Sequence, residues 1–139
     1  MRPHLTLKPK QLAAAILVVL CGGAVGTLGR DLLLKWHSNS SGPDWTSRIP
    51  WMLLLINLVG VFLATRLLRG PLRHHDPNDL TRLLLITGLF GGFTSYSSLF
   101  VDLAAIWHLS VGGSLFVALL ALLSGACAAW LGLGRRHAP

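Results

Sequence analysis

The sequence contains no glutamate and few charged residues of any kind. Of its 139 residues five are acidic, all of them aspartate, while 53% are hydrophobic and 12% are charged. A typical soluble domain carries about 25% charged residues. A chain with half that density cannot cover its apolar surface with polar groups in water, so the composition excludes a disordered tail and most soluble folds.

Cysteine is also scarce, with Cys21 and Cys127 each lying inside an apolar run. Small disulfide scaffolds are dense in cysteine, so that class is excluded. We interpret the two cysteines as small buried residues and not as a disulfide or a metal site.

The formal net charge of +7 is the one feature that could suggest a nucleic-acid partner. The basic residues flank long apolar runs and do not gather into one stretch, so we expect no nucleic-acid binding.

Four apolar segments divide the chain, at about residues 12–34, 49–68, 80–107 and 111–133. Crossing the ~30 Å hydrocarbon core of a bilayer takes about 20 helical residues, and each segment is long enough. No Asp, Glu, Lys or Arg occurs between Asp102 and Arg135. The prediction is a single all-α membrane domain, residues 1–139, with four transmembrane helices in a lipid bilayer.

The basic residues predict the orientation of these helices. Four spans place both termini and the middle loop on one side, which then holds nine basic residues: Arg2, Lys8, Lys10, Arg66, Arg69, Arg73, Arg82, Arg135 and Arg136. The other side holds three: Arg30, Lys35 and Arg48. The positive-inside rule therefore places both termini in the cytoplasm of a multi-pass protein of the cell membrane.

Polar residues within the spans are the candidates for function, because a polar group at membrane depth is costly. Asn57 lies in the run LLLINLVGVFLA, one turn before Gly60; it could line a cavity or bond a neighbouring helix. In GGAVGTLGR the glycines recur at the spacing that lets helices approach closely. Arg30 is the last residue of that run. Its side chain either extends to the membrane–water interface or supplies a fixed positive charge beside the vestibule of a permeation pathway.

The third segment reads TGLFGGFTSYSSLFVDL and is rich in residues that disfavour a helix. The glycines and hydroxyl residues that cause this are Gly88, Gly91, Gly92, Thr94, Ser95, Ser97 and Ser98. Freed carbonyls at a helix break form a hard-oxygen site for a cation such as Na⁺, while N–H groups and hydroxyls can receive an anion. The alternative is that the small residues only admit a crossing helix. The row of hydroxyls favours an ion site.

GGAVGTLGR, INLVG and GLFGGFTSYSS, in this order and in these spans, resemble the signature of the CrcB/Fluc fluoride channel family, and the resemblance covers essentially the whole chain. It implies a four-helix subunit whose third helix is broken mid-membrane, paired with a second subunit in antiparallel, dual-topology-type orientation. Two pores would run along that dimer, with a central structural Na⁺ at its interface. Such a channel exports fluoride passively across the plasma membrane and lowers its concentration in the cytoplasm.

The resemblance also assigns roles to individual residues. Backbone carbonyls of Gly91 and Thr94 would hold the Na⁺. The pore would be lined by Asn57, Tyr96, Ser97, Ser98 and Arg30. Amide and hydroxyl donors can replace the water around a strongly hydrated anion such as fluoride, and an aromatic ring edge carries partial positive charge.

The chain departs from the family at the aromatic positions. The family pattern is TTFSTF, whereas this chain has TSYSSL, with Tyr96 for the first Phe and Leu99 for the second. Phe100 comes one residue late, about 100° round a helix, so we do not expect it to substitute. Ser114 and Ser124 are the candidates for the hydroxyl of the fourth span. Because Leu99 has no electropositive edge, we expect at least one pore built with it to conduct poorly.

The uneven charge and Leu99 together suggest a hypothesis about assembly. An antiparallel homodimer requires a chain that inserts both ways, yet the basic count is nine against three. We hypothesise a fixed topology and a separate, oppositely oriented homologue as partner. One alternative is a non-conducting structural subunit of a heterodimeric channel. The other alternative is a small multidrug exporter, but such exporters use a membrane-embedded Glu, and this chain contains no Glu. No constellation of residues indicates an enzyme.

Overall fold

The computed structural model describes residues 9–36, 45–75 and 79–134, and these residues form helices joined by short connections. Four helices are long and apolar enough to cross a membrane: Pro9–Trp36, Trp51–Arg69, Leu80–Trp107 and Val111–Leu133. This confirms the expected all-α membrane fold. A short 3₁₀ turn, η1 (Trp45–Arg48), precedes the second of them.

The first, second and fourth spans are single helices, α1 (Pro9–Trp36), α2 (Trp51–Arg69) and α6 (Val111–Leu133). The third is in pieces: α3 (Leu80–Arg82), a wider π-helical stretch η2 (Leu83–Phe90), α4 (Gly91–Phe93) and α5 (Tyr96–Trp107).

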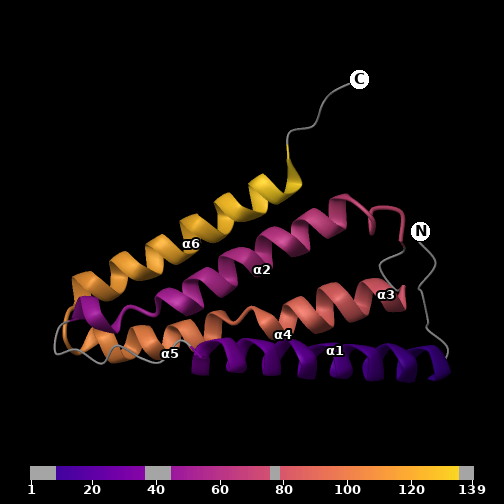
Figure 1. The fold of residues 1–139 in the computed structure, drawn as a ribbon, viewed down its shortest axis with the longest axis horizontal. Helices are drawn as coiled ribbons and strands as arrows, with labels where there is room; N and C mark the ends of the chain where they lie inside the picture. The colour runs from indigo at the N-terminus through magenta and orange to yellow at the C-terminus, as the bar shows by residue number, and fades with distance from the viewer. Residues whose placement is uncertain (1–8, 37–44, 76–78, 135–139) are drawn as a thin grey trace, which may run out of the picture.

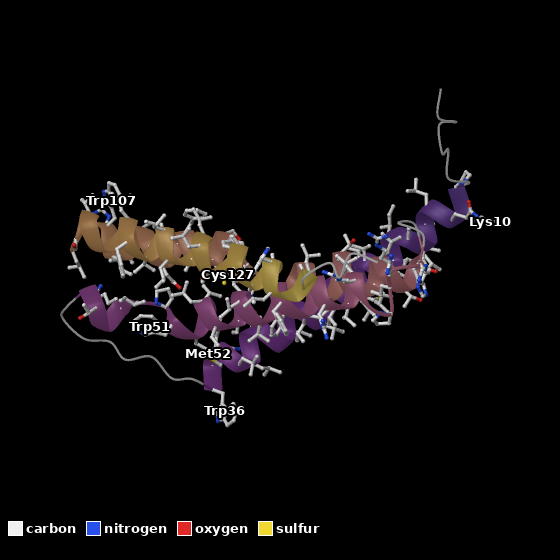
Figure 2. The ribbon with its side chains drawn as sticks, turned by 90° about the horizontal axis from the view of Figure 1, so that it is seen from above. Lys10, Trp36, Trp51, Met52, Trp107 and Cys127 are labelled. Atoms are coloured by element: carbon white, nitrogen blue, oxygen red, sulfur yellow. The ribbon has the colours of Figure 1, made fainter. Side chains whose placement is uncertain are left out.

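The arrangement pairs each half of the third span with a different partner. Figure 1 shows α1 running along α3, η2 and α4 in the same direction, while α2 and α6 run the opposite way. α6 lies along α2 and also contacts α5. In Figure 2 Lys10 lies at one end of the bundle, while Trp51 and Trp107 lie toward the other. The break in the third span therefore occurs where its packing changes from α1 to α6.

Glycines bring α1 and the third span into backbone contact. Gly22 and Gly26 are the buried residues of α1. A Cβ on Gly22 would lie 2.5 Å from the Leu84 carbonyl oxygen, and one on Gly26 would lie 2.1 Å from that of Leu89. Only a residue without a side chain permits this approach. Gly22 and Gly26, four residues apart in GGAVGTLGR, therefore form a packing face of α1.

The apolar core lies between α2, α5 and α6. Its buried cluster consists of Leu53, Leu99, Leu103, Ile106, Val117 and Ala121. On α5 the buried positions repeat every three to four residues, as one face of a helix requires.

The outward faces of the spans are apolar. Leu17 and Leu20 on α1 are each 62% exposed, and Leu123 on α6 is 61% exposed. Such surfaces suit lipid and not water. Cys21 and Cys127 lie on these outer faces as well, so the expectation that they are buried is wrong. An apolar run does not distinguish a residue that faces lipid from one that faces protein.

Candidate functional site

The third span is interrupted at Thr94 and Ser95. Both residues have extended backbone, with φ/ψ of −86°/133° for Thr94 and −144°/99° for Ser95. In Figure 1 the helical ribbon is interrupted by a short non-helical connection between α4 and α5. Gly91 and Gly92 remain helical, so the interruption falls after the glycines and at the start of the hydroxyl run.

Asn57 of α2 satisfies the peptide groups that the interruption frees. Its side chain is 4% exposed. Its Oδ1 accepts from the N–H of Ser95 at 2.8 Å, and its Nδ2 donates to the Ser95 carbonyl at 3.4 Å. An amide side chain carries two N–H donors, so one N–H of Asn57 is not used in this contact.

Ser95 also caps the helix that follows it. Its Oγ accepts from the N–H of Ser98 at 3.2 Å, which satisfies one of the free donors of the first turn of α5. The same Oγ lies 3.0 Å from the hydroxyl of Ser97 and 2.9 Å from that of Ser98. Three serine hydroxyls therefore meet at the N-terminus of a twelve-residue helix, where the helix dipole favours negative charge.

The interruption also redirects the donors of two carbonyls. In a continuous helix the N–H of Ser95 would bond to the carbonyl of Gly91, and the N–H of Ser98 to that of Thr94. Here those two N–H groups bond to Asn57 and to the Ser95 hydroxyl. The carbonyls of Gly91 and Thr94, to which the family resemblance assigns the Na⁺, thus lose their usual helical donors.

Gly60 makes room for the interruption one turn after Asn57. A Cβ on Gly60 would lie 2.4 Å from Cγ2 of Thr94 and 3.3 Å from the Phe93 ring. Thr94 cannot easily rotate away, because its Oγ1 donates to the Phe90 carbonyl at 2.7 Å. The two named residues of the INLVG motif therefore face adjacent residues of the third span, Asn57 facing Ser95 and Gly60 facing Thr94 and Phe93.

Tyr96 and Leu99 both face the inside of the helix bundle. Tyr96 is partly buried against the core cluster, and its hydroxyl approaches Gly125 of α6. Leu99 is 1% exposed within that cluster. Ser97, by contrast, is exposed, as is Phe100 at 58%. Leu99 and Phe100 thus point to different sides, as the 100° step between them requires.

Arg30 lies one turn beyond Gly26, near the end of α1. Its guanidinium contacts a single carboxylate oxygen of Asp31, at 3.1 Å from Nε and 3.0 Å from Nη2. The Arg30 side chain is 15% exposed and that of Asp31 is 49% exposed. The positive charge expected from the sequence is therefore paired with a carboxylate of the same chain.

The two serines of the fourth span have different environments. Ser114 is buried and donates to the carbonyl of Leu103 at 3.0 Å, which links α6 to α5. Ser124 donates to Ala121 in its own helix at 3.2 Å. Ser124 immediately precedes Gly125, the residue that the Tyr96 hydroxyl approaches.

The structure thus gathers Asn57, Ser97, Ser98, Gly91 and Thr94 around one interruption. Tyr96 adjoins it but turns toward α6, and Arg30 is paired with Asp31 on α1. Ser95, which makes most of the hydrogen bonds there, was predicted as part of the hydroxyl run but not as a site residue. The signal was present, since a serine directly before a helical segment fits an N-cap.

Comparison with known proteins gives a consistent result. The model of the family described as "CrcB-like protein, Camphor Resistance (CrcB)" matches residues 17–133. This match begins within the first span and includes the other three spans and the interrupted stretch.

Several curated relatives align over most of the chain. A protein of Agrobacterium fabrum named "Fluoride-specific ion channel FluC" is 34% identical over 119 residues, which cover 85% of this chain and 92% of its own. One of the same name from Rhizobium leguminosarum bv. trifolii is 34% identical over 122 residues, covering 86% and 94%. "Fluoride-specific ion channel FluC 2" of Brucella abortus biovar 1 is 33% identical over 125 residues, covering 88% and 94%.

Proposed function

This chain belongs to the CrcB-like protein family, and from that premise we propose that it is a subunit of a channel through which fluoride leaves the cell passively. The relatives described above are named as fluoride-specific ion channels. These names are also in line with the expectation that the chain is not an enzyme. The observation that carries the proposal is the interrupted third span, where a buried amide bonds the backbone of Ser95 and three serine hydroxyls meet at the same residue.

The chemistry of the interruption suits fluoride. A small anion must exchange its water for other donors before it crosses apolar protein. Asn57 has an N–H beyond the one that it gives to Ser95, and the serine hydroxyls can turn their hydrogens toward an anion. The N-terminus of α5 adds the positive end of a helix dipole. Fluoride would therefore pass along this part of the subunit.

The same interruption fits a structural Na⁺. A hard cation prefers oxygen ligands, and unwound carbonyls coordinate Na⁺ in membrane proteins with broken helices. The Gly91 and Thr94 carbonyls suit this role, because their helical donors are bonded elsewhere. When bound, the ion would join the subunits of an antiparallel pair and add positive potential near the anion path.

We propose a fixed orientation in the plasma membrane with both termini in the cytoplasm. The basis is the nine basic residues on one side of the four spans against three on the other. Fluoride export would then lower the concentration of fluoride in the cytoplasm.

We further propose that the partner is a separate, oppositely oriented homologue. A chain with a decided charge bias inserts one way, whereas an antiparallel pair requires both orientations. Leu99 supports the same proposal, since it fills with an aliphatic side chain a position where the family pattern has Phe. The homologue would supply the missing aromatic edge.

Fluoride efflux from liposomes tests these proposals directly. Vesicles loaded with potassium fluoride and containing this chain with a coexpressed homologue should release fluoride when valinomycin is added. Vesicles loaded with potassium chloride should not release chloride under the same conditions. Robust fluoride efflux from vesicles that contain this chain alone would contradict the heteromeric assembly.

Leu99 also supports a second candidate function, a non-conducting structural subunit. The two candidates differ in what Asn57→Leu does to a coexpressed pair. A pore subunit should lose fluoride efflux through the pathway that it lines, whereas a scaffold should lose only some stability of the dimer. Efflux equal to that of the wild-type pair would favour the scaffold.

A further inference from the structure

The INLVG motif of α2 contacts the interruption of the third span at two points that lie one turn apart. Asn57 bonds the backbone of Ser95, and Gly60 faces the methyl group of Thr94. These are the two residues of the span with extended backbone. One face of α2 therefore contacts both residues of the irregular segment, Asn57 contacting Ser95 and Gly60 facing Thr94.

The contact made by Asn57 competes directly with helix formation. A continuous helix would give the N–H of Ser95 to the carbonyl of Gly91. In apolar surroundings a peptide group without a partner is costly, so that bond would be favoured wherever nothing replaces it. Asn57 replaces it with a bond of 2.8 Å to a side chain that is itself 4% exposed.

The contact made by Gly60 fixes the position of Thr94. Thr94 is held on its other side by the bonds from its N–H and Oγ1 to the Phe90 carbonyl, at 2.9 and 2.7 Å. A methyl group at position 60 would overlap Thr94 at 2.4 Å and push it out of this arrangement. The carbonyl of Thr94 would move with its backbone.

We propose that Asn57 and Gly60 are positioning residues that keep the third span open, so that the carbonyls of Gly91 and Thr94 remain available to a cation. This inference rests on the proposed Na⁺ site and gives Asn57 a role besides contact with fluoride. A single amide would then serve both ions: its oxygen holds the backbone that forms the cation site, and its remaining N–H faces the anion path.

The first experiment measures backbone conformation without any transport. Solid-state NMR of the protein in bilayers reports from ¹³C shifts whether Thr94 and Ser95 are extended or helical. Asn57→Leu keeps the branched shape of the side chain but removes the acceptor, so both residues should move to helical shifts. Ile56→Val, at the neighbouring buried position of α2, is the matched control and should leave them extended. Extended shifts in Asn57→Leu would overturn the proposal.

A second variant guards against failure of Asn57→Leu to fold. Asn57→Asp keeps an oxygen that can accept from Ser95 but loses the amide donor. It should retain the extended shifts while fluoride efflux falls at least tenfold. Helical shifts in Asn57→Asp would overturn the positioning role. Undiminished efflux with extended shifts would leave that role standing and count against contact with fluoride.

Cation binding provides a readout that damage to packing alone does not move. The thermal stability of the purified protein is titrated with NaCl against N-methylglucamine chloride at constant ionic strength. The concentration of Na⁺ that gives half of the stabilisation should rise at least tenfold in Asn57→Leu and severalfold in Gly60→Ala. Ile56→Val should lower the melting temperature without changing that concentration.

The outcomes of the titration separate the inference from the proposed function. A wild-type protein that conducts fluoride but shows no specific response to Na⁺ would overturn the cation part of the inference. Variants that respond to Na⁺ as the wild type does would overturn it as well. Absence of fluoride transport by the wild-type pair would contradict the proposed function, while the NMR shifts would still decide whether α2 holds the interruption open.

Discussion

At the scale of single residues, Tyr96 shows how one hydroxyl constrains the helix opposite it. A Cβ built on Gly125 would lie 2.4 Å from the Tyr96 oxygen but 3.7 Å from the Cζ atom that bears it. The hydroxyl is therefore the part of the Tyr96 side chain that requires glycine at position 125. This chain has Tyr96 where the family pattern has Phe, and the residue of α6 opposite the added hydroxyl is Gly125, which has no side chain.

Gly125→Ala should therefore destabilise the protein, and Tyr96→Phe should rescue it. Overpacking of this kind costs about 1–3 kcal/mol, and removal of the hydroxyl leaves only an ordinary contact of 3.7 Å. The measurement is thermal unfolding of the two single variants and the double variant in detergent. A double variant that is no more stable than Gly125→Ala alone would contradict the pairing.

Asp79 makes the start of the third span sensitive to acid. Its carboxylate accepts from the N–H of Thr81 at 2.8 Å, and this bond, helped by nearby His75, holds the pKa of Asp79 below its ordinary value. The ionised form is therefore favoured in the folded state. Its contribution to stability is present above about pH 4, the ordinary range of an Asp, and is lost as the pH falls through the lowered folded value.

Asp79→Asn should remove this dependence on pH and keep the helix cap, because Asn is an equally good N-cap that does not titrate. The melting temperature of the wild type should fall more between pH 5 and pH 3 than that of the variant. The two proteins are identical at every other position, so the difference isolates position 79. Parallel curves for the two proteins would show that the cap does not depend on its charge.

At the scale of elements, the close contact between α1 and the third span assigns different roles to neighbouring glycines. On Gly26 a Cβ would lie 2.1 Å from the Leu89 oxygen and 2.8 Å from the Phe93 nitrogen, both of them backbone atoms. On Gly23 the nearest such atom, the Gly88 oxygen, is 4.0 Å away. Backbone cannot rotate aside as a side chain can, so only one of the two positions requires glycine.

Gly26→Ala should destabilise the bundle by about 1–3 kcal/mol or more, whereas Gly23→Ala should be neutral or slightly stabilising, because Ala favours a helix over Gly. Thermal unfolding of both variants in the same detergent makes the comparison. Equal losses at the two positions would mean that α1 does not pack against the third span in this register.

The elements also show what sequence can and cannot predict. Hydropathy alone predicts four spans, and the glycines and hydroxyls of the third predict that it is interrupted. They do not predict where, because propensity favours Gly91 and Gly92, while the backbone departs from the helix at Thr94 and Ser95. Asn57, from another span, selects that position with a hydrogen bond. Contacts between distant segments leave no local signal in the chain.

At the scale of the whole molecule, apolar side chains are spread over all four spans, whereas most of the basic residues lie on one side of them. Apolar side chains cover the outside of all four spans, so the sides of the helices do not distinguish one orientation in the bilayer from the other. The basic residues at their ends do, with nine against three. Orientation should thus be a property of the loops, and the choice of partner should follow from it.

Labelling of single cysteines tests this orientation. In a background with Cys21→Ser and Cys127→Ser, His74→Cys lies between the second and third spans and His108→Cys between the third and fourth. Both parent histidines are exposed, and neither is Lys or Arg. A membrane-impermeant maleimide added to intact cells should label only His108→Cys, while permeabilised cells should label both variants. Labelling of both variants in intact cells would mean that the chain inserts in both directions, and an antiparallel homodimer would then require no second gene product.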